Sequence, residues 1–155
     1  MRIMLEEDLA NCRTLEEVQI QTQETLRYFQ SMGDKVVYLA GPISADGEEY
    51  IQRNIDRLVQ SRGRLVRELG RRSGIWSFTA PFIFTSEVYE HLGIFEMDRG
   101  TREAKLQEFW DELILSGAVD GIYFVPGWER STGARRERET AESAGVPMYD
   151  FVPDL

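Results

Sequence analysis

The chain has 155 residues, of which 42% are hydrophobic, so it is long enough for one domain with a sizeable core. A net charge of −9 disfavours general binding to nucleic-acid backbones, because neutralising phosphates requires clustered Lys and Arg. The only cysteine is Cys12, so the sequence predicts neither a disulfide within the chain nor a cysteine-based zinc site. The N-terminus lacks the apolar core of a signal peptide, and no run approaches the roughly 18 apolar residues of a membrane span. We therefore expect a cytoplasmic protein with no nucleic-acid partner and no membrane partner.

The first predicted element is a helix. The run Thr14-Leu15-Glu16-Glu17 has the spacing of a capping box and opens a helix that extends to about Ser31. We expect residues 1–33 to form a helical N-terminal extension, which either caps a sheet or builds an oligomer interface. Residues 34–155 are then expected to form the α/β domain.

Four apolar runs farther along the chain predict strands. They are rich in β-branched and aromatic residues, a composition typical of parallel strands that are covered on both faces. Each is bounded by glycine or proline. The four runs are residues 36–40, 75–80, 121–125 and 146–152.

Helical patterns separate these runs. The first apolar stripe follows a capping-box spacing at Asp46 to Glu49, and the last predicted helix, Thr132 to Ala144, has Ser131 as its N-cap. Alternating strands and helices predict a three-layer Rossmann-like or flavodoxin-like α/β fold with a parallel sheet and right-handed crossovers. The first stripe is Ile51, Ile55, Leu58, Leu65, Val66 and Leu69, and the second is Leu106, Phe109, Trp110, Leu113 and Gly117.

A long insertion follows the second predicted strand. Residues 82–100 are rich in aromatic side chains and lie after the carboxyl end of that strand. Ligands of parallel α/β sheets bind at this edge, so we expect the insertion to be a lid or a pocket wall.

Glu137 differs from the two other acids on the last predicted helix. Glu139 and Glu142 each follow an arginine by four residues, Arg135 and Arg138, and fit an exposed, charge-paired face. Glu137 has no such partner, so it is either an ordinary solvated glutamate or a carboxylate of the ligand site. It lies on a stripe of small residues expected to face the sheet: Ala134, Ala141 and Ala144.

Two turns are candidate ligand contacts. The helix start Ser131-Thr132-Gly133 offers free backbone N–H groups and the positive end of the helix dipole, which either bind a phosphate or carboxylate or serve only in capping. The turn after the first strand, Gly41-Pro42-Ile43-Ser44, begins with a glycine that allows a ligand to approach the backbone.

Four further side chains have chemistry that bears on a ligand site. Asp111 lies beside an apolar stripe and has no cation within one helical turn. It is therefore either a second carboxylate of the cleft or a surface acid. Tyr38 fits the core, with a hydroxyl that reaches toward the strand end, and Trp128 either stacks on a base or covers the core. His91 is the only histidine, which gives no support to a Ser-His triad centred elsewhere or to a His-rich metal site.

Three motifs in this order resemble the nucleoside 2-deoxyribosyltransferase-like superfamily, most closely its bacterial and phage branch. The resemblance spans roughly Lys35 to Phe151. The superfamily includes 2'-deoxynucleoside 5'-phosphate N-hydrolases and cytidine monophosphate N-hydrolases. The motifs are Tyr38-Leu39-Ala40-Gly41-Pro42-Ile43, Trp110-Asp111-Glu112-Leu113, and the run from Pro126 to Glu137.

The resemblance implies a role for each matching residue. Glu137 matches the glutamate that attacks the anomeric carbon, and Asp111 matches an aspartate that assists at the sugar or the leaving base. Tyr38 matches the tyrosine that steers the glutamate. Ser131 and Gly133 match the helix start that binds phosphate in the monophosphate hydrolases.

The implied reaction is hydrolysis or transfer at the N-glycosidic bond of a nucleoside or nucleoside 5'-monophosphate, without a metal or cofactor, by a homodimer or larger homo-oligomer. A carboxylate stabilises the oxocarbenium character of the sugar and forms a glycosyl intermediate. Family hydrolases often have an arginine soon after the first-strand turn, where this chain continues Ser44-Ala45-Asp46, so the need for a 5'-phosphate stays open. Two alternatives also stay open: a non-catalytic module that binds or senses a nucleotide derivative, and hydrolysis of the nicotinamide–ribose bond of NAD.

Overall fold

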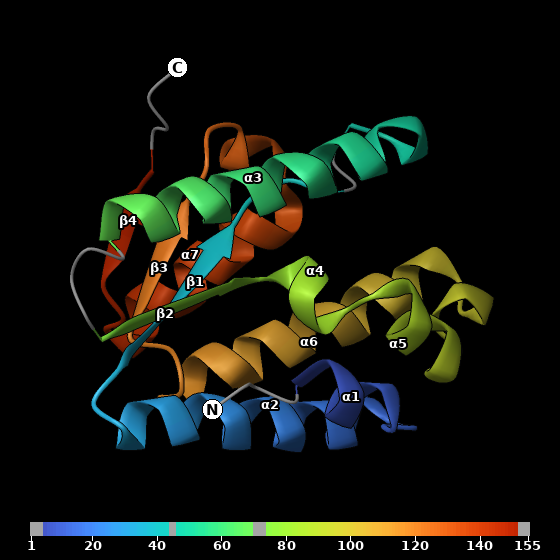
Figure 1. Cartoon of the computed structure of the whole chain (residues 1–155). Coiled ribbons are helices and arrows are strands. Elements are labelled where there is room, and N and C mark those ends of the chain that lie inside the picture. The colour runs from blue at the N-terminus through green and yellow to red at the C-terminus, as the bar shows by residue number, and fades with distance from the viewer. Residues whose placement is uncertain (1–4, 44–45, 70–73, 152–155) are drawn as a thin grey trace.

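Four parallel strands form the sheet at the centre of the structure, a computed structural model that describes residues 5–43, 46–69 and 74–151 (Figure 1). The strand order is β2-β1-β3-β4, and each neighbouring pair is parallel. Each strand lies within one of the four predicted runs or starts one residue before it, so the predicted parallel α/β fold is confirmed. The strands are β1 (Lys35–Ala40), β2 (Ile75–Thr79), β3 (Gly121–Phe124) and β4 (Met148–Asp150).

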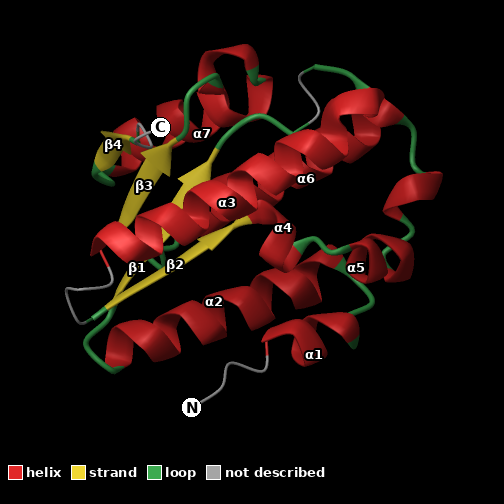
Figure 2. Ribbon diagram, turned by 45° about the horizontal axis from the view of Figure 1, so that its top comes forward, coloured by secondary structure: helices red, strands yellow, loops and turns green. Residues whose placement is uncertain are grey.

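Helices cover both faces of this sheet and make a three-layer, Rossmann-like arrangement (Figure 2). One face is covered by α2, α6 and α7, and the other by α3. The helices are α1 (Leu5–Ala10), α2 (Leu15–Ser31), α3 (Ile51–Leu69), α4 (Ala80–Ile83), α5 (Ser86–His91), α6 (Arg99–Leu115) and α7 (Thr132–Ala144). Three short 3₁₀ turns are η1 (Glu48–Tyr50), η2 (Ile94–Glu96) and η3 (Trp128–Arg130).

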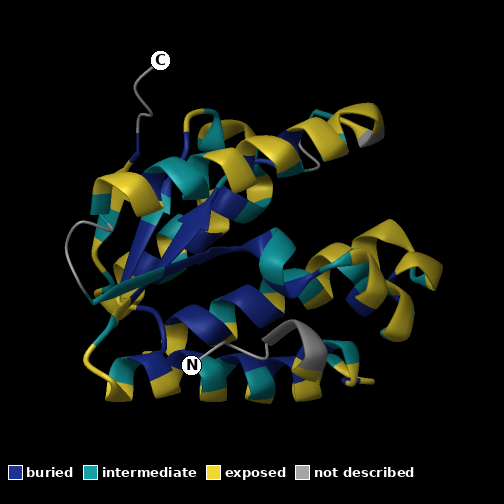
Figure 3. Ribbon diagram, viewed as in Figure 1, coloured by how far each residue is buried: buried dark blue, intermediate teal, exposed yellow. Residues whose placement is uncertain are grey.

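The alternation of side chains along β1 explains why its run of apolar residues is unbroken. Val36, Tyr38 and Ala40 join the core under α2 and α6, while Val37 and Leu39 join the core under α3. Successive side chains of a strand point to opposite faces, so both sets must be apolar when both faces are covered. Figure 3 shows the resulting buried layer through the sheet.

The stripe predicted on α3 is only partly correct. Leu58 and Leu65 are fully buried against β1, but Val66 is 39% exposed. The most buried polar residue of this helix is Asn54, which is 1% exposed and whose amide bonds the turn after β1. Where the sequence predicts a capping box at Asp46 to Glu49, the structure has the 3₁₀ turn η1. The Asp46 carboxylate accepts hydrogen bonds from Arg130 and Asn54.

The N-terminal helix α2 is part of the sheet's main packing layer. Thr14 caps it by accepting a hydrogen bond from the Glu17 N–H at 3.1 Å, as the capping spacing predicts. Val18, Leu26 and Phe29 are buried in the same core cluster as β1. The predicted division of the chain at residues 33 and 34 stays a prediction, but α2 covers the sheet directly.

The predicted insertion consists of short elements that pack beside α1 and α6. Phe84 contacts Phe109 and Trp110 edge to face, with ring centroids 4.8 and 5.8 Å apart. A hollow of about 310 Å³ lies between α1 and the start of the insertion. The role of the insertion as a lid or pocket wall stays a prediction. None of the helices in the described ranges is long and apolar enough to cross a membrane.

Candidate functional site

The candidate site is built around Glu137, on the second turn of α7. Ser131 caps this helix and its Oγ accepts a hydrogen bond from the Ala134 N–H at 3.1 Å, as predicted. The stripe of small residues turns Glu137 toward the sheet, because Ala134 and Ala141 on the same stripe are buried. Glu137 itself is 6% exposed, although Ala144, at the end of the stripe, is exposed instead of facing the sheet.

Tyr38 connects the sheet to this carboxylate. Its hydroxyl donates a hydrogen bond to Glu137 Oε1 at 3.3 Å, the only side-chain hydrogen bond of Glu137 within the described part of the chain. The ring is held by Trp110, with centroids 4.8 Å apart and nearly parallel planes, and by Phe78 at 5.2 Å. Two aromatic contacts therefore fix the direction in which the buried hydroxyl points.

Burial dominates the protonation of both groups. The pKa of Glu137 is raised to about 8, mainly because burial disfavours the charged form; the Tyr38 hydrogen bond opposes this rise, and the negative charge of Asp111 adds to it. Burial and the Glu137 carboxylate raise the pKa of Tyr38 well above its ordinary value, so the phenol stays a hydrogen-bond donor. A carboxyl that titrates near neutral pH beside a fixed donor is a typical feature of a reactive site.

Asp111 lies on α6, which packs beside α7. Its Oδ1 accepts hydrogen bonds from the Thr140 hydroxyl at 2.9 Å and from Gln107 Nε2 at 3.2 Å. Its Oδ2 pairs with the Arg136 guanidinium, with Nη2 at 3.1 Å. Asp111 is therefore a fixed negative charge next to Glu137, and its cationic partner comes from the neighbouring helix.

The predicted charge pairs on α7 differ from those observed. Arg138 pairs with Asp150 of β4 at 3.0 Å, and Arg135 donates to the Thr132 hydroxyl at 3.3 Å. The pairs expected from the helical spacing, Arg135 with Glu139 and Arg138 with Glu142, are not among the ion pairs of the described residues. The expected exposure of Glu139 and Glu142 is nevertheless confirmed, and Glu137 is buried.

The helix start at Ser131-Thr132-Gly133 remains accessible. Thr132 is exposed, and a Cβ added to Gly133 would lie 3.7 Å from Gln107 Oε1, which is ordinary contact. Gln107 therefore lies between the helix start and Asp111, to which its amide nitrogen donates. Binding of a ligand at this helix start stays a prediction.

Trp128 lies in η3 and is half-buried. Its ring packs on Phe124 at 5.5 Å, and the Arg138 guanidinium lies 4.5 Å from the ring centroid. The tryptophan thus covers the core and holds a cation against one face. Stacking of Trp128 on a base stays a prediction.

The turn after β1 is held tightly by its neighbours. A Cβ added to Gly41 would lie 2.9 Å from Leu58 Cδ2 and within overlap of the Val125 side chain. Packing inside the chain therefore accounts for this glycine, and its contact with a ligand stays a prediction. Pro42 is buried and Ile43 is half-buried, while the predicted contact Ser44 lies outside the described residues.

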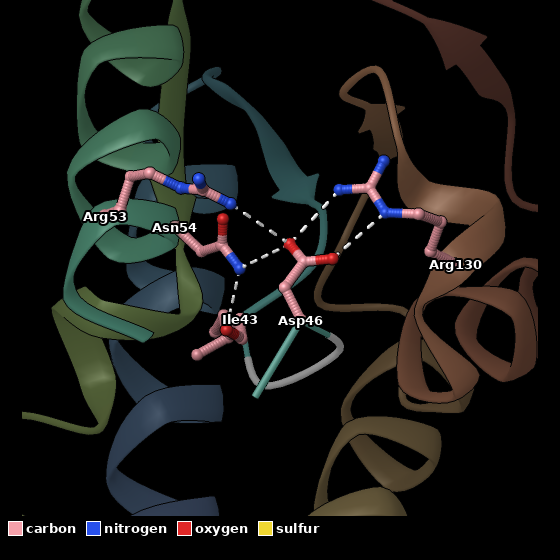
Figure 4. A network of polar contacts seen from close by, with 5 residues as sticks. All are labelled: Ile43, Asp46, Arg53, Asn54 and Arg130. Carbon is pink, nitrogen blue, oxygen red and sulfur yellow. Dashed lines mark hydrogen bonds and ion pairs between the residues drawn. The ribbon is translucent and has the colours of Figure 1, made fainter. Parts of the chain in front are cut away.

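A polar network joins this turn to η3 (Figure 4). Arg130 donates from Nε and Nη2 to the two oxygens of Asp46, both at 3.2 Å. Asn54 Nδ2 donates to Asp46 Oδ2 at 3.1 Å, and Arg53 Nη2 lies 3.6 Å from the same oxygen. Hydrogen bonds from Arg130 and Asn54 lower the pKa of Asp46, so its carboxylate is ionised at neutral pH.

Several residues of this site were missed in the sequence. Gln107 precedes Asp111 by four positions, so helical spacing alone could have paired them. Arg136 and Thr140 reach Asp111 from a different helix, and Arg130 reaches Asp46 across the strand ends, so no local signal marks them. Within the described ranges, no group of three histidine, cysteine or acidic side chains gathers as a metal site requires.

One family model matches part of the chain. Residues 80–150 are similar to a domain of unknown function (DUF4406). This segment includes Asp111 and Glu137 but not β1 with Tyr38. No curated protein and no solved structure matches the chain. The matched family carries no assigned function, so the resemblance to the nucleoside 2-deoxyribosyltransferase-like superfamily stays a prediction.

Proposed function

We propose that the protein is an N-glycosidase or glycosyltransferase that cleaves the N-glycosidic bond of a nucleoside or nucleoside 5'-monophosphate. Glu137 is the nucleophile. The observation that carries this proposal is the buried Glu137 carboxylate, which is 6% exposed, accepts a hydrogen bond from Tyr38 and lies beside the charge of Asp111. The resemblance of three sequence motifs to the superfamily agrees with the proposal.

Burial suits Glu137 to nucleophilic attack. As the bond between the anomeric carbon and the base nitrogen breaks, a Glu137 oxygen bonds to that carbon, and the carboxylate charge is lost in a neutral ester. The base leaves with the bonding electrons and takes up a proton from solvent water. Burial destabilises the ionised carboxylate and leaves the ester unaffected, so it favours formation of the glycosyl intermediate. Attack by water or by a second base then releases the sugar and restores Glu137.

Tyr38 acts as a positioning residue. Its hydroxyl binds Oε1, so Oε2 is the oxygen left to attack. The stacked Trp110 ring and the neighbouring Phe78 ring restrict the motion of Tyr38. Holding the carboxylate in one orientation lowers the entropic part of the barrier.

Asp111 contributes a fixed negative charge. Its oxygens accept hydrogen bonds from Thr140, Gln107 and Arg136, which is how an ionised carboxylate is held. A charge at this place stabilises positive charge that develops on the sugar ring. Such stabilisation fits the role at the sugar that the resemblance implies for Asp111. Asp111 then acts through its charge, whereas Glu137 acts as the nucleophile.

The proposal is tested by incubating the protein with a panel of nucleosides, nucleoside 5'-monophosphates and NAD, and measuring free base by chromatography. We expect base release from at least one nucleoside or monophosphate, and a fall of roughly 10³-fold or more in Glu137→Gln. Glu139→Gln is the matched control, because Glu139 is an exposed acid on the same helix.

Other results would contradict the proposal in distinct ways. Release of nicotinamide alone would favour the NAD reaction. Binding of a nucleotide without release of any base would favour a sensing module. Base release that is unchanged in Glu137→Gln would remove Glu137 from the mechanism.

A further inference from the structure

We propose that Gln107 determines which base the site accepts, because its Oε1 accepts a hydrogen bond from an exocyclic amino group of that base. This inference rests on the proposed function and names its substrate class: compounds with an amino-bearing base such as adenine or cytosine, in preference to an oxo-bearing base. Gln107 lies on α6, one helical turn before Asp111. The orientation of its amide, the free state of its oxygen and the position of that oxygen beside α7 support the inference.

Asp111 fixes the orientation of the Gln107 amide. An ionised carboxylate only accepts hydrogen bonds, so the nitrogen of the amide must face it. That nitrogen donates to Asp111 Oδ1 at 3.2 Å, and the same oxygen accepts from the Thr140 hydroxyl at 2.9 Å. The other carboxylate oxygen pairs with Arg136. Turning the amide around would place two oxygens against each other, so Gln107 Oε1 points away from Asp111.

The amide oxygen of Gln107 has no donor inside the chain. Among the described residues, the only hydrogen bond of this side chain is the one from its nitrogen to Asp111. Gln107 is half-buried, so Oε1 has lost part of its hydration without gaining a protein donor in return. A ligand that brings an N–H group to this oxygen supplies the missing hydrogen bond.

The free oxygen lies beside the face of α7 that carries the proposed nucleophile. A Cβ added to Gly133 would lie 3.7 Å from Gln107 Oε1 and 3.8 Å from Ser131 Oγ. Gly133 precedes Glu137 by four residues, so the two positions share one face of α7 and are separated by about 6 Å along its axis. A nucleoside whose sugar is at Glu137 can therefore place its base at Gln107.

An acceptor that cannot turn distinguishes an amino group from an oxo group. An amino group donates to Oε1, whereas an oxo group presents a second acceptor and leaves both oxygens unpaired. Sites built to form a hydrogen bond reject analogues that cannot form it, because their polar groups lose water and gain no partner. The Asp111–Gln107 pair thus selects bases by their exocyclic group.

The test measures kcat/KM for adenosine against inosine and for cytidine against uridine, each as the nucleoside or the 5'-monophosphate, whichever releases more base. The two members of each pair differ by an amino group in place of an oxo group. The variants are Gln107→Met, which keeps the length of the side chain without an acceptor, and Asp111→Asn. Gln60→Met is the matched control, because Gln60 is an exposed glutamine on α3. A second arm, which needs no turnover, measures the change in Tm caused by the four free bases.

We expect the wild-type protein to prefer the amino-bearing member roughly tenfold or more. Gln107→Met should lower kcat/KM for that member much more than for the oxo-bearing member, so the ratio should fall roughly tenfold. Asp111→Asn should also lower the ratio, because an amide at position 111 lets the Gln107 amide turn and offer its nitrogen to an oxo group. Gln60→Met should keep the wild-type ratio.

A wild-type protein that prefers oxo-bearing bases, or has no preference, would overturn the inference. Equal losses for both members in Gln107→Met would overturn it as well, since they would show that Gln107 only positions Asp111. If Gln107→Met does not fold, the wild-type preference and the ratio in Asp111→Asn decide.

Failure of all substrates to release base would count against the proposed function, and the free bases would then decide the role of Gln107. Greater stabilisation by adenine than by hypoxanthine, or by cytosine than by uracil, that is lost in Gln107→Met would support the inference. Equal or absent stabilisation by the four bases would overturn it.

Discussion

Glu137 retains a proton that an exposed glutamate would lose, and this ties one side chain to the stability of the whole chain. Its pKa is about 8 in the folded protein against an ordinary 4.5. Below pH 4.5 the carboxyl is protonated in both states and makes no difference. Between pH 4.5 and 8 the unfolded chain ionises while the folded chain does not, so folding stability falls as pH rises.

Glu137→Gln should therefore stabilise the protein at alkaline pH. The amide keeps an oxygen for the Tyr38 hydroxyl and never ionises. We expect its Tm to match that of the wild type near pH 4.5 and to exceed it increasingly up to pH 8. The corresponding gain in the free energy of unfolding is up to about 5 kcal/mol at pH 8. Thermal unfolding over this pH range, with Glu139→Gln as control, measures the difference. A Tm below that of the wild type at pH 8 would show a mainly structural role for Glu137.

Asp111 should set the pH dependence of the proposed reaction. Attack requires the ionised Glu137, so kcat/KM should rise with pH through the pKa of about 8. Asp111→Asn removes a negative charge that raises this pKa, and the rise should move to lower pH. A profile measured for both proteins tests this. A lower rate with an unmoved profile would mean that Asp111 does not act on Glu137 electrostatically.

At the scale of elements, the end of β1 and the body of α3 contain two glycines with opposite predicted effects. A Cβ at Gly41 overlaps Val125 and lies close to Leu58, so Gly41→Ala should destabilise the protein by roughly 1 to 3 kcal/mol. Gly63 lies inside α3 with open space around it, so Gly63→Ala should stabilise it by about 0.5 to 1 kcal/mol. Denaturant unfolding of both variants measures these changes. A neutral Gly41→Ala would mean that the turn after β1 adapts easily.

The same scale shows what the sequence predicts well. The strands were found because buried parallel strands have continuous apolar runs, and α2 and α7 because Thr14 and Ser131 are ordinary N-caps. Glu137 was singled out by the missing arginine four residues before it, and the structure shows that it is buried. Contacts between different elements could not be predicted from the sequence. The fold brings Arg138 to Asp150 and Arg130 to Asp46, and spacing along a single helix does not indicate either pair.

At the scale of the whole molecule, α2 belongs to the layer that covers the sheet. Val18, Leu26 and Phe29 are buried, and each such side chain contributes roughly 1.5 to 3 kcal/mol, so their sum is comparable with the roughly 5 to 15 kcal/mol that stabilises a domain. A chain that starts at residue 34 should therefore lose cooperative unfolding. Circular dichroism on heating tests this. A cooperative transition in the shortened chain would support an independent domain over residues 34–155.

The central claim concerns the covalent role of Glu137, and the stereochemistry of the product tests it most directly. When a β-nucleoside is turned over in the presence of methanol, attack by Glu137 followed by attack by methanol inverts the anomeric carbon twice. We therefore predict a methyl glycoside of retained, β configuration, identified by NMR of the product. The α anomer, formed by direct displacement, would contradict the account.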